Sequence, residues 1–300
     1  MSGEDSDSRT ISVVFNPVSG LGAGRVALRD LTDRLSAFGM PYQVTETGGP
    51  GDGAAVARAA DPEHCRAILI IGGDGTINDV MNGPVPRGVP IGLIPFGTGN
   101  VLSTALRLPR SPAELVDAVR GKRTRQIDLV ERDGRRFASV AGIGFDAYVV
   151  EELSRHRSGN IRKWSYAVPI LRAMARYRFP AIRVRVDSRT IGENFGMVIL
   201  GNVWNYGGIL RVAPRARPDD GLIDVCIFGG RKRTDLLRYA AALPFGLHLA
   251  YPDVRYLRGK EVLVEATEGG EIPVELDGDP GGTLPARFRV LPLEATLLVA

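Results

Sequence analysis

The sequence predicts two domains, an α/β domain built on a parallel sheet and then an antiparallel β-sandwich domain. At 300 residues the chain exceeds the usual size of one hydrophobic core. Up to residue 127, apolar strands alternate with helical segments, which is typical of a parallel sheet covered on both faces. From residue 128, short strands of alternating polarity follow one another between turns, which is typical of a sandwich or barrel.

The first domain is expected over 11–127, after a disordered tail at 1–10. ISVVF and AILII are apolar runs that are too short for helices and end at Asn-Pro and Gly-Gly turns, so both predict buried strands. The expected strands are 11–15, 41–46, 67–71 and 89–94, and the expected helices are 25–38, 53–60, 76–82 and 111–120.

The second domain is expected over 128–294. Turns with Gly, Asp or Pro separate its strands, and two longer segments, 146–178 and 232–250, have helical patterns. A last strand at 295–299 could return to complete the first domain's sheet. The other expected strands are 136–141, 181–187, 195–200, 222–228, 261–266, 272–276 and 287–291.

Composition excludes several classes of protein. Apolar residues make up 44% and charged residues 24%, as in ordinary soluble proteins. No apolar run reaches the ~18 residues of a membrane helix, and the polar N-terminus is no signal peptide, so we expect a cytoplasmic protein. Cys65 and Cys226 lack a C-x-x-C partner and the three histidines are scattered, which excludes a zinc site. A G-x-S-x-G motif is also absent, which argues against a serine triad.

The strongest chemical signal is Gly72-Gly73-Asp74-Gly75-Thr76, directly after an expected strand. Its glycines let backbone N–H groups approach an anion, and Thr76 would open a helix whose N-terminus favours phosphate. Asp74 would repel a bare phosphate, but it suits a magnesium ion that lies between carboxylate and phosphates. The alternative is a tight turn with Asp74 as a helix cap.

Two further loops have the same character. Asn16-Pro17-Val18-Ser19-Gly20 ends the first strand, and the segment from Pro95 to Asn100 (PFGTGN) ends the fourth. Because ligands bind at the carboxyl edge of parallel sheets, three such loops predict one phosphate and nucleotide site. A plain turn remains the alternative for either loop alone.

A dinucleotide fingerprint competes with this interpretation. GAGRVA at 22–27 fits G-x-G-x-x-A, and Glu46 follows at about the distance expected for a ribose-binding acid. However, six residues separate Phe15 from Gly22, whereas the first glycine should follow the strand at once. A P-loop is absent, so a nucleoside triphosphate would bind without its lysine.

Taken together, the ordered motifs resemble those of bacterial diacylglycerol kinases and sphingosine kinase-like lipid kinases. This branch belongs to the superfamily of the NAD kinases and phosphofructokinases. The resemblance extends from about residue 11 to 299. It is carried by NPVSG at 16–20, GGDGTINDVMNG at 72–83, PFGTGN at 95–100, DDGLID at 219–224 and LDGD at 276–279.

The resemblance implies an ATP- and Mg²⁺-dependent kinase with an NAD kinase/phosphofructokinase-like first domain. Asp74 and Asp128 would serve the catalytic magnesium, and Asp279 would be the general base. A structural magnesium would bind Asp220 and the carbonyls of Arg217 and Leu222. The residues that would line the ATP site are Asn16, Pro17, Val18, Ser19, Gly20, Thr45, Gly72, Gly73, Asp74, Gly75, Thr76, Ile77, Asn78 and Thr98.

The chain departs from the family pattern at two acids. Asp79 and Asp279 stand where the family usually has glutamate, so each carboxylate reaches about an ångström less far. Asp277 and Glu275 are possible substitutes for the base, Glu275 being the weaker candidate. Solvated turn residues are the alternative for all these acids.

The segment 155–178 is strongly basic. It carries seven Arg or Lys, no acid, and the aromatic residues Trp164, Tyr166 and Tyr177. This composition favours transient contact with an anionic membrane surface. A solvated helix face is the alternative. Single-stranded nucleic acid would bind the same residue types, but we do not expect it as a partner. The oligomeric state is left open, a homodimer included.

The expected function is therefore transfer of phosphate from ATP to a lipid hydroxyl, with ATP and magnesium in the cleft between the domains and diacylglycerol or a related lipid as substrate. The protein would be cytoplasmic and peripherally membrane-associated. The alternatives are an NAD kinase-like enzyme with a soluble substrate and a non-catalytic nucleotide sensor.

Overall fold

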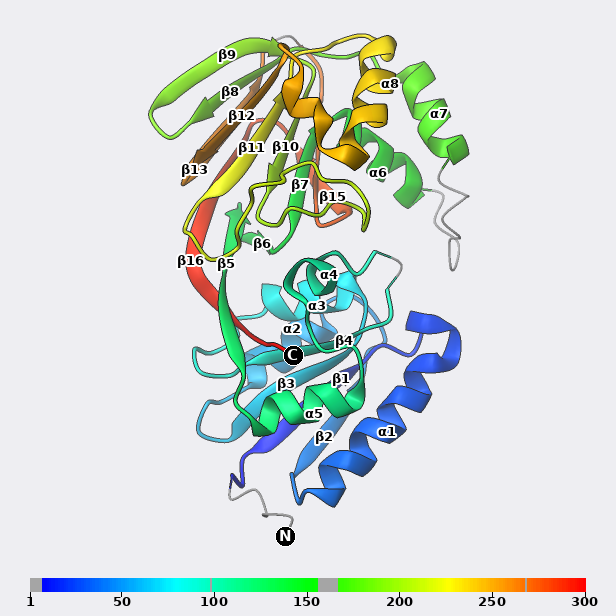
Figure 1. Ribbon diagram of the computed structural model, residues 1–300, viewed down its shortest axis with the longest axis vertical. Helices are drawn as coiled ribbons and strands as arrows, with labels where there is room; N and C mark the ends of the chain where they lie inside the picture. The colour runs from blue at the N-terminus through cyan, green and yellow to red at the C-terminus, as the bar shows by residue number, and fades with distance from the viewer. Residues whose placement is uncertain (1–6, 98, 156–166, 268) are drawn as a thin grey trace. The chain divides into compact units, whose positions relative to one another are not determined.

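The computed structural model describes residues 7–97, 99–155, 167–267 and 269–300 (Figure 1). The chain forms two compact units. Unit 1 comprises Met1–Asp128 and Pro292–Ala300, and unit 2 comprises Leu129–Leu291. Two strands, β5 (Thr124–Arg132) and β16 (Ala286–Leu298), contribute residues to both units.

Unit 1 contains a parallel sheet with the strand order β2-β1-β3-β4, next to the end of β16. Leu297 of β16 pairs with Ile91 of β4 in parallel, so the segment expected as a strand at 295–299 joins this sheet. The strands are β1 (Thr10–Phe15), β2 (Tyr42–Glu46), β3 (Cys65–Gly72) and β4 (Ile91–Pro95).

Helices cover both faces of this sheet. Alternate residues of β1 and β3, such as Val13 and Leu69, pack against Leu31 of α1 and Leu115 of α5. On the other face, α2 and α3 pack against each other and against β1 and β3. The helices are η1 (Ser19–Gly22), α1 (Ala23–Ala37), α2 (Asp52–Ala59), α3 (Asp74–Asn82), α4 (Val101–Leu106) and α5 (Pro112–Arg120).

Unit 2 is an antiparallel sandwich. One sheet has the order β12-β11-β10-β7-β14-β15, and the other contains β5, β6, β8, β9, β13 and the first part of β16. Aliphatic residues and Phe137, Phe195 and Phe288 fill the space between the sheets. The remaining strands are β6 (Arg135–Phe137), β7 (Val140–Gly144), β8 (Ile182–Val186), β9 (Arg189–Phe195), β10 (Met197–Gly201), β11 (Ile223–Phe228), β12 (Val254–Gly259), β13 (Glu261–Ala266), β14 (Pro273–Leu276) and β15 (Asp279–Thr283).

Helices of unit 2 pack on the outer face of its first sheet (Figure 1). The expected helical segment 146–178 contains two helices, α6 (Phe145–Arg155) and α7 (Ala167–Arg176). The segment 232–250 contains α8 (Arg233–Ala242), η3 (Leu243–Phe245) and η4 (Leu247–Ala250). Among the described residues, no helix is both long and apolar enough to cross a membrane.

These two units confirm the predicted fold class. Individual elements differ from the expectations: 287–291 and 295–299 belong to a single strand, β16, which continues through Pro292. Sequence analysis missed α4, β5, β9, β12 and β15, because these segments are short or carry charged residues at exposed positions.

Candidate functional site

The three glycine-rich loops meet in unit 1 at the carboxyl ends of β1, β3 and β4. The Asn16 side chain, through Nδ2, donates a hydrogen bond of 3.0 Å to Thr76 Oγ1, which joins the first loop to the second. The Phe96 N–H donates to the Gly72 carbonyl at 2.7 Å, which joins the third loop to the second. The structure thus brings together the loops that were predicted to form one site.

Three glycines make this close approach possible. A Cβ on Gly72 would lie 2.6 Å from Thr76 Oγ1, and a Cβ on Gly73 would lie 2.9 Å from the Cα of Gly97. Gly20 has φ +73°, and a Cβ there would lie 2.6 Å from Phe96 Cδ1. Any side chain at these positions would push the loops apart.

Asp74 is the half-buried acid of this site, with its Oδ1 atom buried, and is the first residue of α3. Burial raises the pKa of Asp74, while hydrogen bonds from the backbone N–H groups of Val101, Leu102 and Asn100 oppose this rise. Its Oδ1 is buried and has no hydrogen-bond partner in the described part of the structure. A buried carboxylate oxygen without a partner is costly unless something binds it.

This arrangement fits a magnesium ion. Mg²⁺ prefers carboxylate oxygens together with the oxygens of a nucleotide's phosphates, and Asp74 Oδ1 is a carboxylate oxygen next to three loops rich in backbone N–H groups. A bound cation would also stabilise the ionised carboxylate. Nevertheless, the described residues contain no cluster of three or more His, Cys, Asp and Glu side chains that could hold a metal, so the phosphates would have to complete the coordination.

The other residues predicted for the nucleotide site have varied environments. Val18 is exposed, whereas Thr76, Ile77 and Asn78 are buried. Thr45 lies on β2 and lines a cavity of about 300 Å³, whose other lining residues all lie outside the three loops. Thr98 falls outside the described residues.

Three further acids of unit 1 have structural partners. Asp79, one of the two departures from glutamate, accepts hydrogen bonds from Gly51 N at 3.0 Å and Gly53 N at 2.8 Å, at the start of α2. Asp128 is buried on β5 and accepts a hydrogen bond from Leu293 N at 2.8 Å. Glu46, the candidate ribose acid of the dinucleotide alternative, forms an ion pair with Arg25 at 3.2 Å.

In unit 2, the turn between β14 and β15 holds two acids in different environments. Asp277 accepts hydrogen bonds from the N–H groups of Ala138, Ser139 and Val140 at 2.9–3.0 Å, and so fixes the start of β7. Asp279, the candidate base, is 42% exposed and lies 3.5 Å from Arg135 Nη2. Of the two carboxylates, Asp279 is the more accessible to a substrate.

Glu275 belongs to a buried acid cluster that sequence analysis did not identify. Its partner Asp146 lies in the first turn of α6, and Tyr206 donates a hydrogen bond to Asp146 Oδ1. Burial raises the pKa of Asp146 to about 6, and burial together with the Asp146 charge raises the pKa of Glu275 well above its usual range. A Cβ on Gly142 would overlap the Asp146 carboxylate, so this glycine makes room for the pair. The sequence signal for this cluster was G-I-G-F-D at 142–146, in which an acid closely follows a strand that contains two glycines.

Glu275 also links this pair to the candidate base. Glu275 Oε2 accepts a hydrogen bond of 2.7 Å from the N–H of Gly278, the residue before Asp279. Two adjacent carboxyl groups in a buried site share a proton rather than ionise together. The pair can therefore hold a proton near neutral pH while it fixes the backbone that carries Asp279.

The predicted structural metal site lies at the turn around Asp219 and Asp220. Asp220 forms an ion pair with Arg258, and its Oδ1 accepts a hydrogen bond from Leu222 N at 3.2 Å. The Arg217 side chain approaches Asp219 at 3.6 Å. The Arg258 guanidinium thus already supplies positive charge to Asp220, and a magnesium site at Arg217, Asp220 and Leu222 remains a prediction.

The basic segment 155–178 is only partly described. Residues 156–166, which include Lys163 and Trp164, lie outside the described residues, whereas Arg172, Arg176 and Arg178 are exposed. Tyr177 is buried against Phe145 and Phe179, so it packs in a small aromatic cluster of unit 2 and is not available to a membrane surface.

Comparison with known proteins places both units in known families. The family model "Diacylglycerol kinase catalytic domain" matches residues 10–132, and the "YegS C-terminal NAD kinase beta sandwich-like domain" matches residues 139–299. A diacylglycerol kinase of Mycobacterium tuberculosis (strain H37Rv) is 30% identical over 297 residues, which cover 96% of this chain and 94% of the relative. A diacylglycerol kinase of Staphylococcus carnosus is 26% identical and covers 92% and 90%.

Solved structures share the fold. The crystal structure of a diacylglycerol kinase from Bacillus anthracis str. Sterne superposes with a TM-score of 0.74 at 20% identity and covers 99% of this chain and 98% of that one. The two-unit architecture is therefore common to both chains.

Proposed function

The chain belongs to the diacylglycerol kinase family, and from this we propose that it transfers the γ-phosphate of ATP to the hydroxyl group of a membrane lipid, diacylglycerol or a close relative, with magnesium. The observation that carries the proposal is the half-buried Asp74 carboxylate, held where three glycine loops meet. Loops rich in backbone N–H groups suit phosphates, and an acid among them suits a phosphate-bound cation.

We propose that unit 1 binds the nucleotide. Backbone N–H groups of the loops at 16–20 and 72–76 would bind the phosphates, and Asp74 would hold the ion through Oδ1. The ion would neutralise charge on the β- and γ-phosphates during transfer. Asn16 would act as a positioning residue, since its amide fixes Thr76.

We propose that unit 2 activates the acceptor. Asp279 would take the proton of the lipid hydroxyl as the hydroxyl oxygen forms a bond to the γ-phosphorus. The bond between that phosphorus and the β–γ bridging oxygen breaks, and ADP leaves with the electron pair. Asp279 suits this role because it is accessible and its turn is fixed by Asp277 and Glu275.

The test is phosphate transfer to lipid. Purified protein is incubated with γ-labelled ATP, magnesium and diacylglycerol in detergent micelles, and the organic phase is analysed for label. We expect labelled phosphatidic acid from the wild type, none above background from Asp74→Asn, and orders of magnitude less from Asp279→Asn. Circular dichroism verifies that both variants are folded.

Other outcomes would identify a different function. ATP binding without transfer to any lipid extract would indicate a nucleotide sensor. Label that appears only in a soluble acceptor such as NAD would indicate a soluble-substrate kinase. Wild-type rates in Asp74→Asn would exclude the role given to that carboxylate.

A further inference from the structure

Large apolar side chains face solvent on the outer side of α8 and of the turns after it. The inner residues Leu236 and Tyr239 are buried, and Tyr239 packs against Phe228 of the underlying sheet. On the outer side, Leu237 is 57%, Phe245 74% and Leu247 60% exposed. Large apolar side chains that remain exposed beside a packed inner side suit a second apolar environment.

The loop beside α8 extends this surface. Ile209 is 69% exposed, and the loop is attached to the end of α8 by a hydrogen bond of 3.3 Å from Arg211 N to the Leu243 carbonyl. We call Ile209, Leu237, Phe245 and Leu247 the apolar patch. They are four of the nine large apolar side chains that are exposed in the described part of the chain. Such clustering marks a binding surface.

Basic residues border the patch. Segment 231–250 contains four Arg or Lys and one acid, Asp235. The Arg233 guanidinium donates to the carbonyls of Met174 and Ala175 at 2.8 and 2.6 Å, which joins the start of α8 to the end of α7. The exposed residues Arg172 and Arg176 of α7 therefore add positive charge next to Arg231 and Lys232, at the start of α8. An apolar centre with a basic border suits an anionic lipid surface.

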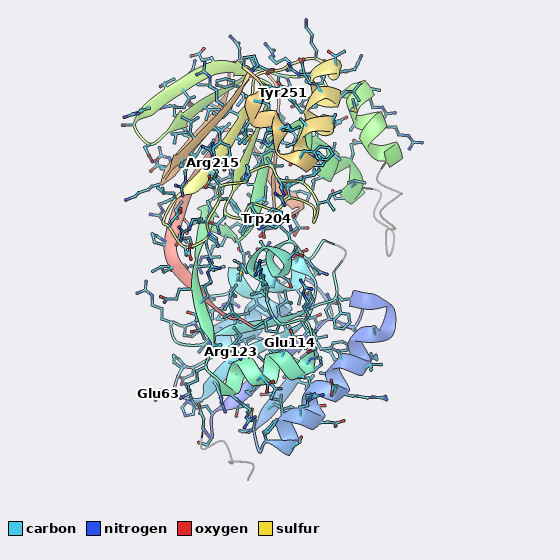
Figure 2. All side chains as sticks on the ribbon, viewed as in Figure 1. Glu63, Glu114, Arg123, Trp204, Arg215 and Tyr251 are labelled. Atoms are coloured by element: carbon cyan, nitrogen blue, oxygen red, sulfur yellow. The ribbon has the colours of Figure 1, made fainter. Side chains whose placement is uncertain are left out.

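The same loop connects the patch to the buried acid cluster. Tyr206, at one end, donates to Asp146, and it pairs with Leu210 at the other end. Ile209 lies between them and faces solvent. Figure 2 labels Tyr251 beside α8, where its ring packs against Tyr239 and beneath the Arg238 guanidinium, so the inner side of this region is firmly packed. The patch thus lies on a well-packed base.

We propose that the apolar patch docks the protein on the surface of an anionic bilayer, with Phe245 and Leu247 inserted among the lipids and the basic border at the headgroups. This inference rests on the proposed lipid kinase function, because it gives unit 2 access to a membrane-resident acceptor. It assigns the apolar part of the docking surface to 209 and 237–247, and of the basic segment 155–178 it uses Arg172 and Arg176 in the border.

The test is vesicle binding, measured by flotation without nucleotide or turnover. Vesicles consist of equal parts phosphatidylcholine and phosphatidylglycerol, and a second set consists of phosphatidylcholine alone. We expect the Phe245→Ser/Leu247→Ser variant to bind the mixed vesicles at least about tenfold more weakly than the wild type. Val26→Ser, at a 70% exposed position of α1, is the matched control and should bind like the wild type.

A second measurement reports insertion directly. In Phe245→Trp, fluorescence from the new indole should be quenched by lipids brominated in their acyl chains, and in Val26→Trp it should not. Arg172→Gln/Arg176→Gln should reduce binding to mixed vesicles and remove most of the preference over phosphatidylcholine.

Several results would overturn the inference. Equal vesicle binding by the wild type and Phe245→Ser/Leu247→Ser would do so, as would a wild type that does not bind mixed vesicles. Another outcome is a wild type that sediments as a dimer and a Phe245→Ser/Leu247→Ser variant that sediments as a monomer, with equal vesicle binding. The patch would then be an interface between two copies of the chain. The vesicle measurements need no phosphate transfer, so a failed kinase assay would not change their result. Conversely, a protein that does not bind vesicles could still phosphorylate lipid in micelles.

Discussion

At the scale of single residues, the site in unit 1 depends on positions that tolerate no side chain. Gly72 is the clearest case, because a Cβ there would lie 2.6 Å from Thr76 Oγ1 and 2.7 Å from Thr76 Cβ. Thr76 cannot move without losing its hydrogen bond from Asn16. The hydrogen bond that joins the first two loops therefore depends on the absence of a methyl group at Gly72.

We expect Gly72→Ala to lower the free energy of unfolding by about 1–3 kcal/mol, as overpacking generally does. Gly75→Ala is the matched control, because a Cβ at Gly75 meets nothing within 4 Å in the first turn of α3. It should leave stability unchanged or raise it by up to about 1 kcal/mol. Urea unfolding followed by far-UV circular dichroism compares the two. Equal effects of both substitutions would contradict the steric argument.

At the scale of elements, the turn between β14 and β15 separates a structural acid from an accessible one. Asp277 accepts three backbone N–H groups, whereas Asp279 is 42% exposed beside Arg135. We expect Asp277→Ala to cost about 3 kcal/mol or more, because it leaves N–H groups without an acceptor. Asp279→Ala should cost less than about 1 kcal/mol. Urea denaturation measures both, and a large loss in Asp279→Ala would show that this acid is structural as well.

The elements also show which features can be predicted from sequence. The strand β3 was predicted because its residues lie in the interior and its part at 67–71 is a continuous apolar run. β9 and β12 are largely exposed, carry charged residues without a regular alternation, and so resemble loops. The meeting of the three glycine-rich loops was predicted from glycine spacing at strand ends. The Asp146–Glu275–Tyr206 cluster was not, because its members lie far apart in the chain and meet only when α6, β14 and the loop after β10 pack together.

At the scale of the whole molecule, the chain has two separate hydrophobic cores. α1 and α5 pack on the parallel sheet in unit 1, and the two sheets of unit 2 enclose their own interior. Both tryptophans of the sequence, Trp164 and Trp204, belong to unit 2. Tryptophan fluorescence therefore reports the unfolding of unit 2, and circular dichroism reports that of the whole chain.

The buried carboxyl pair makes the stability of unit 2 depend on pH. Burial raises the pKa of Asp146 from 3.8 to about 6, so the folded state keeps a proton that the unfolded chain releases near pH 4. The stabilisation from this proton is complete below pH 4 and is lost as the pH rises through 6. For Asp146 the loss amounts to about 2–3 kcal/mol, and Glu275, whose pKa is also raised, adds to it in the same direction.

The isosteric variant Asp146→Asn/Glu275→Gln cannot titrate at either position. We therefore expect its stability relative to the wild type to improve by at least about 2 kcal/mol between pH 4 and pH 8. Urea unfolding followed by tryptophan fluorescence at several pH values measures this difference. Other carboxylates titrate in both proteins, so they cancel in the comparison. A constant difference across this range would show that the pair is ionised in the folded protein, and the proton we assign to it would then be absent.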